Sequence, residues 1–257
     1  MALQFTQASS NKVTVTNPLT ITGSFSYVLW IRQRGAPNNS EGTNKGAIDL
    51  LVFFDNWFCN VPRATTAAQS DVTNANLFPD GNWVFLAVTY SEASGVRFYR
   101  GTQTAPPSEM TYFATVAGSG ATTSESGDLY ICNRGAANIL SPAHDIATSA
   151  LFNAELPLNV IRDLWNSAPM LPSCKMLFEL GFNGVGQQPD LSGSRNAGTV
   201  TGASVKNHPY ANPYRPQPRR KWQGYDGFGP LMSRRILARA PTTGGFRSRI
   251  AGGFIST

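Results

Sequence analysis

The chain has 257 residues, of which 41% are hydrophobic and only 14% are charged, and it contains 24 glycines and 17 prolines. This composition excludes a coiled coil, a helical bundle and a fully disordered chain, and it supplies enough apolar material for a sizeable core. No apolar run approaches the 18 or so residues that a membrane-spanning helix needs.

The net charge of +6 is unevenly distributed along the chain. Residues 1–205 carry 11 Lys and Arg against 14 Asp and Glu, whereas residues 206–257 carry ten Lys and Arg against the single Asp226. The same 52 residues hold six of the prolines. We therefore predict a nearly neutral folded domain over residues 1–205, followed by a basic, Pro/Gly-rich and extended C-terminal arm over residues 206–257.

The pattern of apolar residues in the first 182 positions is typical of β-strands. Alternation with period 2 and clusters of β-branched or aromatic residues predict strands over residues 2–5, 12–15, 24–32, 46–54, 57–62, 82–90, 96–100, 112–116, 129–133, 143–152 and 176–182. The strand at 24–32 is apolar on both faces, which suits the middle of a two-layer sandwich. One helix is predicted over residues 156–165, where apolar residues fall about a turn apart. Eleven or twelve short strands and one helix indicate an all-β sandwich.

Four groups of segments occur in the order found in a known class of sandwich. They are residues 2–5, 13–15 and 25–31 (first strands), 83–90 and 95–101 (a central hairpin whose first strand reads WVFLAVTY), 127–134 (a closing segment before the helix), and 189–193 with 198–203 (a strand-and-turn signature). Together they resemble the laminin G-like, concanavalin A-like jelly rolls. The resemblance covers residues 2–205 and implies a jelly roll with one short helix, whereas the arm matches no part of the family.

The resemblance brings no catalytic residues with it. Glycosidases of this fold resemble one another in a Glu-x-Asp-x-x-Glu strand, which places two carboxylates on one face. None of the six glutamates here stands in such a motif. His144 and Asp145 are neighbours, so in a strand their side chains point to opposite faces and cannot build a triad. We therefore expect a protein that is not an enzyme.

Metal and redox chemistry find no support in the sequence either. His144 and His208 are the two histidines, and neither has a partner at metal-ligand spacing. The three cysteines, Cys59, Cys132 and Cys174, are widely scattered. Because the N-terminal residues lack the pattern of a signal peptide, we expect synthesis in the cytosol, with the thiols reduced and buried.

Carbohydrate binding stays open as an alternative. Sugar sites on this fold combine an aromatic platform with Asp and Asn acceptors, sometimes around a calcium ion. The candidate residues in predicted loops and strand ends are Trp57, Asp80, Asn82 and Tyr112. Asp and Asn are also ordinary turn formers, and a Trp in a strand usually packs in the core. We expect no cofactor, with calcium as the one ion that this alternative would bring.

The basic arm carries regularly spaced aromatic and cationic residues. Its proline density favours extended chain, which cannot bury enough surface by itself to offset the entropy of ordering. We predict that it docks on neighbouring subunits or another partner, rather than wrapping its own sandwich or contacting nucleic acid. The predicted anchors are Tyr210, Tyr214, Arg219, Arg220, Lys221, Trp222, Tyr225, Phe228, Arg234, Arg235, Phe246, Arg247, Arg249 and Phe254.

A lectin-like sandwich without an export signal, a basic arm and no encoded chemistry together favour a virion structural protein. Laminin G-like modules occur in phage capsid-decoration and tail proteins, which assemble in the host cytoplasm. The leading hypothesis is a minor capsid or decoration protein that is held to other virion proteins by its arm and forms homo-oligomers. The alternative is a carbohydrate-binding adhesin or a tail receptor-binding module. Nucleic acid and membrane are not expected partners.

Overall fold

The computed structural model describes residues 1–6, 11–34, 41–52, 56–73, 77–78, 81–133, 143–166, 171–181 and 183–207. The chain divides into two units, Met1–Gln217 and Pro218–Thr257, and the second unit lies wholly outside the described residues. All the predicted anchors of the arm also lie outside them, so the arm stays a prediction.

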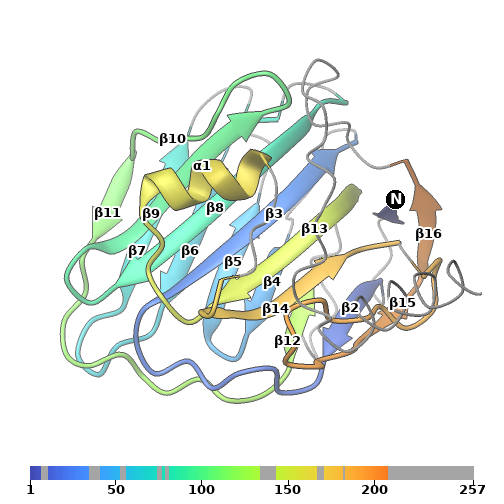
Figure 1. Ribbon diagram of the computed structural model, residues 1–257. Coiled ribbons are helices and arrows are strands. Elements are labelled where there is room, and N and C mark those ends of the chain that lie inside the picture. Colours follow the sequence, from blue (N-terminus) through green and yellow to red (C-terminus); the bar gives the residue numbers. More distant parts are fainter. Residues whose placement is uncertain are drawn as a thin grey trace, which may run out of the picture. The chain divides into compact units, whose positions relative to one another are not determined.

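Two antiparallel sheets form a sandwich (Figure 1). The first sheet has the order β10 (Ser108–Glu109), β9 (Gly95–Thr102), β8 (Trp83–Ser91), β3 (Phe25–Gln33), β13 (His144–Phe152), β1 (Ala2–Phe5) and β16 (Ala203–Lys206), and β14 (Cys174–Glu179) also pairs with β13. The second sheet has the order β11 (Ala114–Val116), β7 (Ala68–Thr73), β6 (Asn56–Val61), β5 (Ile48–Val52), β4 (Glu41–Lys45), β12 (Leu129–Ile131), β2 (Lys12–Val15) and β15 (Gly198–Thr201).

The central strands of the first sheet are buried on both faces. The sheet's inner face, with Leu29 and Ile31 of β3, packs against the second sheet in the main core. Its outer face, with Val28 and Trp30, packs in a second apolar cluster that includes buried residues of the helix α1 (Leu158–Asn166). Figure 1 shows the helix lying across the strands of this sheet. The two-faced apolar pattern predicted for this strand is therefore confirmed.

The second sheet is buried on one face only. In β5 the buried residues Ile48, Leu50 and Val52 alternate with the half-buried Asp49 and Leu51. The same alternation runs through β6 and β12. Half-exposed side chains therefore cover the outer face of this sheet, as is usual for antiparallel sheets with one solvated side.

The predicted elements are found, with ends displaced by a few residues, and four strands were missed: β4, β7, β10 and β16. β15 lies in segment 198–203, which was expected only as part of the strand-and-turn signature that the resemblance implies. β4 reads EGTNK and β7 reads AQSDVT, so neither has the apolar alternation on which the predictions rest. β10 has two residues, and β15 and β16 are short, half exposed and rich in Gly, Ser and Thr.

Two boundaries differ from the prediction for identifiable reasons. The strand expected over residues 46–54 begins at Ile48, because Gly46 has a φ of 60° and belongs to the turn between β4 and β5. The helix begins at Leu158 rather than at residue 156, and its first turn closes where Ile161 N–H donates to Pro157 O at 3.1 Å. Proline is well accommodated at this end of a helix because the first N–H groups have no intrahelical acceptor.

The three cysteines are free thiols and all are buried, as predicted. Within the described residues, α1 is far too short to cross a membrane, so the structure offers no membrane-spanning helix there.

Candidate functional site

A groove lies on the outer side of the first sheet, between β9, β10 and the segment that leads into α1. Its volume is about 340 Å³. Because side chains alternate along β9, Phe98 points into the core while Arg97 and Tyr99 point into the groove. Glu109 of β10 is paired with Tyr99, which brings its carboxylate to the same side. Residues 155–158 form the other wall of the groove.

Arg97 interacts with two carboxylates of the groove. Its Nη1 atom lies 3.7 Å from Oε2 of Glu109, with both side chains about two-fifths exposed. Partial burial lowers the pKa of Arg97, but the negative charges of Glu109 and Glu155, together with the Tyr99 hydroxyl, outweigh that effect and raise it. The guanidinium therefore stays charged within reach of both acids.

Tyr112 fixes the position of Glu109. Its hydroxyl accepts a hydrogen bond from Phe98 N–H at 3.0 Å and donates one to Glu109 Oε1, also at 3.0 Å. Burial is the main reason why the pKa of Tyr112 is raised, so the phenol keeps the proton that it donates. Tyr112 is half-buried behind the carboxylate. It supports the groove and does not supply the exposed ring that the sequence suggested.

The groove offers both halves of what a polyhydroxylated ligand needs. The carboxylates of Glu109 and Glu155 accept hydrogen bonds, and the guanidinium of Arg97 donates them. Pro157 and Leu158, with the buried Leu156 behind them, line the same groove with apolar surface, against which the C–H face of a ring can pack.

The other residues predicted for a sugar site do not join this groove. Trp57 is fully buried, with its ring centroid 5.4 Å from Phe78 and 6.3 Å from Phe98, so it has no face on which a sugar could stack. Asn82 is exposed just before β8. The groove lies beside Ala87 and Thr89 of that strand, roughly 17–23 Å further along. Asp80 lies outside the described residues.

Sequence reasoning missed the three charged residues of the groove. Arg97 and Tyr99 sit two positions apart on a predicted strand, so their shared face was visible in the sequence. No sequence pattern placed Glu109 and Glu155 in the same site, because the sequence does not show that β10 and the segment before α1 meet beside β9.

His144 and Asp145 lie on opposite faces of β13, as predicted. His144 is fully buried, and its ring centroid is 5.8 Å from that of Phe78. Asp145 is also fully buried and forms ion pairs with Arg32 and Arg34, each with an Nε within 3.0 Å of a carboxylate oxygen. The pair is structural and forms no triad.

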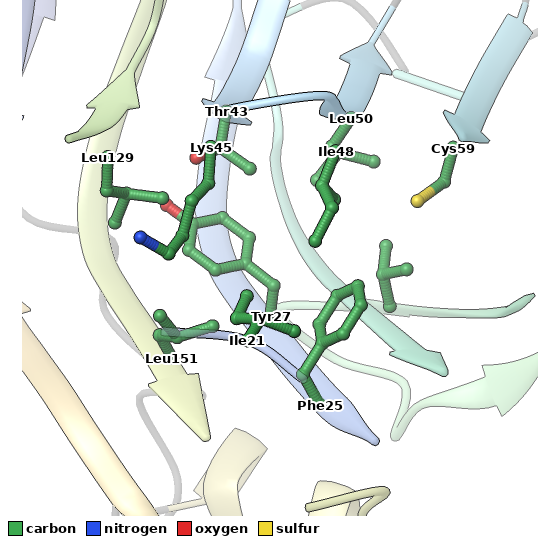
Figure 2. Close-up of a pocket in the computed structure, with 11 residues that line it drawn as sticks. Ile21, Phe25, Tyr27, Thr43, Lys45, Ile48, Leu50, Cys59, Leu129 and Leu151 are labelled. Atoms are coloured by element: carbon green, nitrogen blue, oxygen red, sulfur yellow. The ribbon is translucent and has the colours of Figure 1, made fainter. Parts of the chain in front are cut away.

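A second cavity, inside the sandwich, is too small for a ligand (Figure 2). Its volume is about 20 Å³, close to the space of one water molecule, and its walls are almost entirely apolar. Lys45 extends along its edge, and its Nζ donates to Gly127 O at 2.7 Å. Burial lowers the pKa of Lys45, while Asp128 and Glu125 act against that shift.

The part of the chain that the structure describes contains no cluster of metal-ligating side chains. No three His, Cys, Asp or Glu side chains gather there in a way that could hold an ion. The calcium ion considered for the sugar alternative therefore has no identified ligands, and that expectation remains untested.

Residues 7–133 match the sequence model of the concanavalin A-like lectin/glucanases superfamily. The sandwich has a concanavalin A-like fold. The matched segment runs from the β1–β2 connection to the end of β12, and the structure extends the domain through α1 to β16.

Solved structures share this fold at low sequence identity. The concanavalin A-like domain is similar to a Bacteroides ovatus protein provisionally assigned to carbohydrate binding, with a TM-score of 0.52 and 14% identity over 77% of this chain and 60% of that one. This chain thus spans less than two thirds of that protein.

Two binding domains of botulinum neurotoxins score lower. Serotype G gives a TM-score of 0.43 at 10% identity over 62% of this chain and 40% of that one. Neurotoxin DC, solved with rat synaptotagmin II, gives 0.39 at 13% identity over 57% and 36%. No curated protein matches the chain. At such identities the likenesses reflect the fold alone. The TM-scores of the neurotoxin domains lie below 0.5 and support no functional comparison.

Proposed function

We propose that the concanavalin A-like domain is a non-enzymatic carbohydrate-binding module, and that a saccharide binds in the groove between β9, β10 and the start of α1. The observation that carries the proposal is the groove itself. Within about 340 Å³ it combines two carboxylates, one guanidinium and an apolar wall. The provisional assignment of the Bacteroides ovatus protein, which shares the fold, is consistent with this function.

The hydrogen bonds within the groove favour binding over hydrolysis. Retaining and inverting glycosidases need one carboxylic acid that protonates the leaving oxygen and a second carboxylate that acts as nucleophile or base. Glu109 instead accepts the Tyr112 hydroxyl on one oxygen and lies beside Arg97 on the other. A carboxylate held in this way serves as a fixed acceptor for ligand hydroxyls.

The test is a glycan array with the full-length protein, followed by calorimetry on the best ligand. Glu109→Gln keeps the shape of the side chain and removes its charge. Because a hydrogen bond to a charged group contributes about 1.5–3 kcal/mol, we expect the Kd to rise roughly 10- to 100-fold. Asp163→Asn is the matched control, since Asp163 is exposed on α1 and does not line the groove. An array without ligands, or equal Kd values for the Glu109 and Asp163 variants, would refute the proposal.

We further propose that the protein works as a virion structural protein on a phage capsid, where the arm predicted over residues 206–257 holds it to neighbouring subunits. The support is the arm's composition, with ten Lys and Arg against one acid. A tail receptor-binding or adhesin module is the alternative, and it would use the same groove.

Purified particles test this role. We expect the full chain to be found on particles, and we expect a chain that ends at Asn207 to be lost from them. The cut belongs after residue 207 because Val205 and Lys206 pair with β1 and complete the first sheet. If the shortened chain decorated particles normally, the arm would not be the anchor.

A further inference from the structure

A continuous row of side chains crosses the outer face of the second sheet. The strand pairing aligns one outward residue from each of six neighbouring strands, in the order β7, β6, β5, β4, β12 and β2. We call this the cross-strand row; its residues are Gln69, Asn60, Asp49, Asn44, Tyr130 and Thr14. With strands 4.7–4.9 Å apart, the row is about 24 Å long.

Hydrogen bonds between neighbours hold the row in place. Gln69 Nε2 donates to Asn60 Oδ1 at 3.0 Å, and Asn44 Nδ2 donates to Asp49 Oδ1 at 2.6 Å. Next to the row, Phe58 and Asp71 pair with each other across β6 and β7 and face the same side, both half-exposed. Asn44 is buried and positions Asp49, whereas the other residues of the row are half-exposed. The surface is therefore a preorganised strip of amides, carboxylates and apolar side chains.

The strip is acidic. Asp49 and Asp71 lie on it, and Asp128 interacts with the Tyr130 hydroxyl at its far end. Two cations lie near Asp128 at that end of the strip: Lys12 lies over the Tyr130 ring at 5.0 Å from the centroid, and Lys45 interacts with Asp128. The negative charge of the strip is therefore concentrated on Asp49 and Asp71. The fixed charges of the strip thus attract a cationic partner.

We propose that the cross-strand row and its neighbours Phe58 and Asp71 form a docking surface on this chain. Its occupant is the part of the basic arm that follows β16, residues 208–257, of a second copy of this chain. The arm carries nine Lys and Arg against the single Asp226, so its charge is complementary to the strip. Asp49 Oδ1 already accepts the hydrogen bond from Asn44, but arginine also forms single charge-assisted hydrogen bonds with carboxylates, which makes Asp49 and Asp71 suitable anchors. Phe58 offers an apolar contact for the aromatic residues that alternate with the arginines.

The length of the arm also fits the strip. Residues 209–222 contain four prolines and the run Arg219-Arg220-Lys221-Trp222. In an extended polyproline-type conformation these 14 residues would span roughly 43 Å, so fewer than ten of them cover the row. A proline-rich segment also loses less conformational entropy on binding than an ordinary chain.

A saccharide suits this face less well than an arm does. The Tyr130 ring is already covered by the Lys12 ammonium, which leaves the half-exposed Phe58 as the aromatic contact that the strip offers. The charges of Asp49 and Asp71 attract a cationic peptide, whereas a neutral sugar gains no binding energy from those charges. The row lies on the second sheet and the groove on the outer side of the first, so both are usable at once. This inference does not depend on saccharide binding in the groove.

Photo-crosslinking of the full-length protein tests the proposal. Phe58 is replaced by the photo-crosslinker p-benzoylphenylalanine, and the protein is mixed with an equal amount of ¹⁵N-labelled wild-type protein before irradiation. We expect crosslinked peptides that join position 58 of one chain to residues 208–257 of a chain with the other label. Crosslinks confined to one chain would show that the arm wraps its own sandwich, and an absence of crosslinks to residues 208–257 would remove the arm from this surface. Either result overturns the proposal.

Charge variants test the chemistry of the same contact. Asp49→Asn combined with Asp71→Asn removes two charges with little change of shape, and Asp163→Asn on α1 is the control. We expect the double variant to weaken self-association, measured by analytical ultracentrifugation over a concentration series, by roughly 3- to 30-fold, and we expect the control to leave it unchanged. Added salt should weaken the wild type more than the double variant. Equal association constants for the wild type and the double variant would overturn the electrostatic part of the proposal.

Discussion

Acid should destabilise this protein through His144. The side chain is fully buried at the start of β13, and neither ring nitrogen has a hydrogen-bond partner among the described residues. Burial, reinforced by the positive charge of Arg34, lowers the pKa of His144 to about 3. In the unfolded chain the pKa returns to about 6.5, so the unfolded state takes up the proton first as the pH falls.

The size of the effect follows from the shift. Stability that is present above pH 6.5 is lost as the pH falls from 6.5 towards 3, by about 1.4 kcal/mol per pH unit and by about 5 kcal/mol in total. His144→Leu removes the titrating group together with two buried polar atoms. The variant should therefore be at least as stable as the wild type at pH 7 and should lose stability less steeply below pH 6.

Urea unfolding between pH 3.5 and 7.5 measures both curves. His208→Asn is the matched control, because His208 is the other histidine of the chain and lies outside the described domain. The control should keep the wild-type slope. If the wild type and His144→Leu ran parallel from pH 7.5 to 3.5, the ring would not be neutral in the folded state and the reasoning would be wrong.

Three further changes test the description of the core, a turn and the groove. Trp57→Ala should lower the free energy of unfolding by about 3–5 kcal/mol in urea titrations, since the ring is fully buried; a loss below 1 kcal/mol would mean that the indole is not part of the core. Gly118→Ala should cost more than about 1 kcal/mol, because φ is 73° and a Cβ atom would lie 2.7 Å from Ala68 N; an unchanged urea midpoint would contradict this turn. Tyr112→Phe should raise the saccharide Kd several-fold by calorimetry, because Glu109 loses the donor that positions it, and a larger effect than that of Glu109→Gln would speak against this supporting role.

The sequence predicts the strands that are buried on at least one full face. β8 and β13 each place nine consecutive residues in the interior and β3 places its first seven there, and β3 and β8 are apolar over most of their length. Prediction from the sequence fails for β4 and β7, because their strand conformation is imposed by pairing with neighbouring strands. Asn44 of β4 pairs with β5, and Gln69 of β7 pairs with β6. Tertiary context decides such strands, and local propensity does not.

The candidate site was less accessible to sequence reasoning than the fold. Trp57 alternates with Cys59 and Val61 along β6, so its place in the core could be expected from the pattern. The groove could not, because Glu109 and Glu155 lie 46 positions apart and meet Arg97 only through the packing of β10 and the pre-helical segment beside β9. A contact between residues so far apart in the sequence produces no periodic pattern from which it could be predicted.

The pairing of β1 with β16 has a consequence for biosynthesis. Ala2 faces Lys206 and Phe5 faces Ala203, so the first strand of the sandwich finds its last neighbour some 200 positions later. A ribosome must release nearly the whole domain before that edge closes, and until then β1 presents an unpaired backbone to other nascent chains. Slow translation or premature termination should therefore lead to aggregation, and trigger-factor-type chaperones should be retained until β16 emerges.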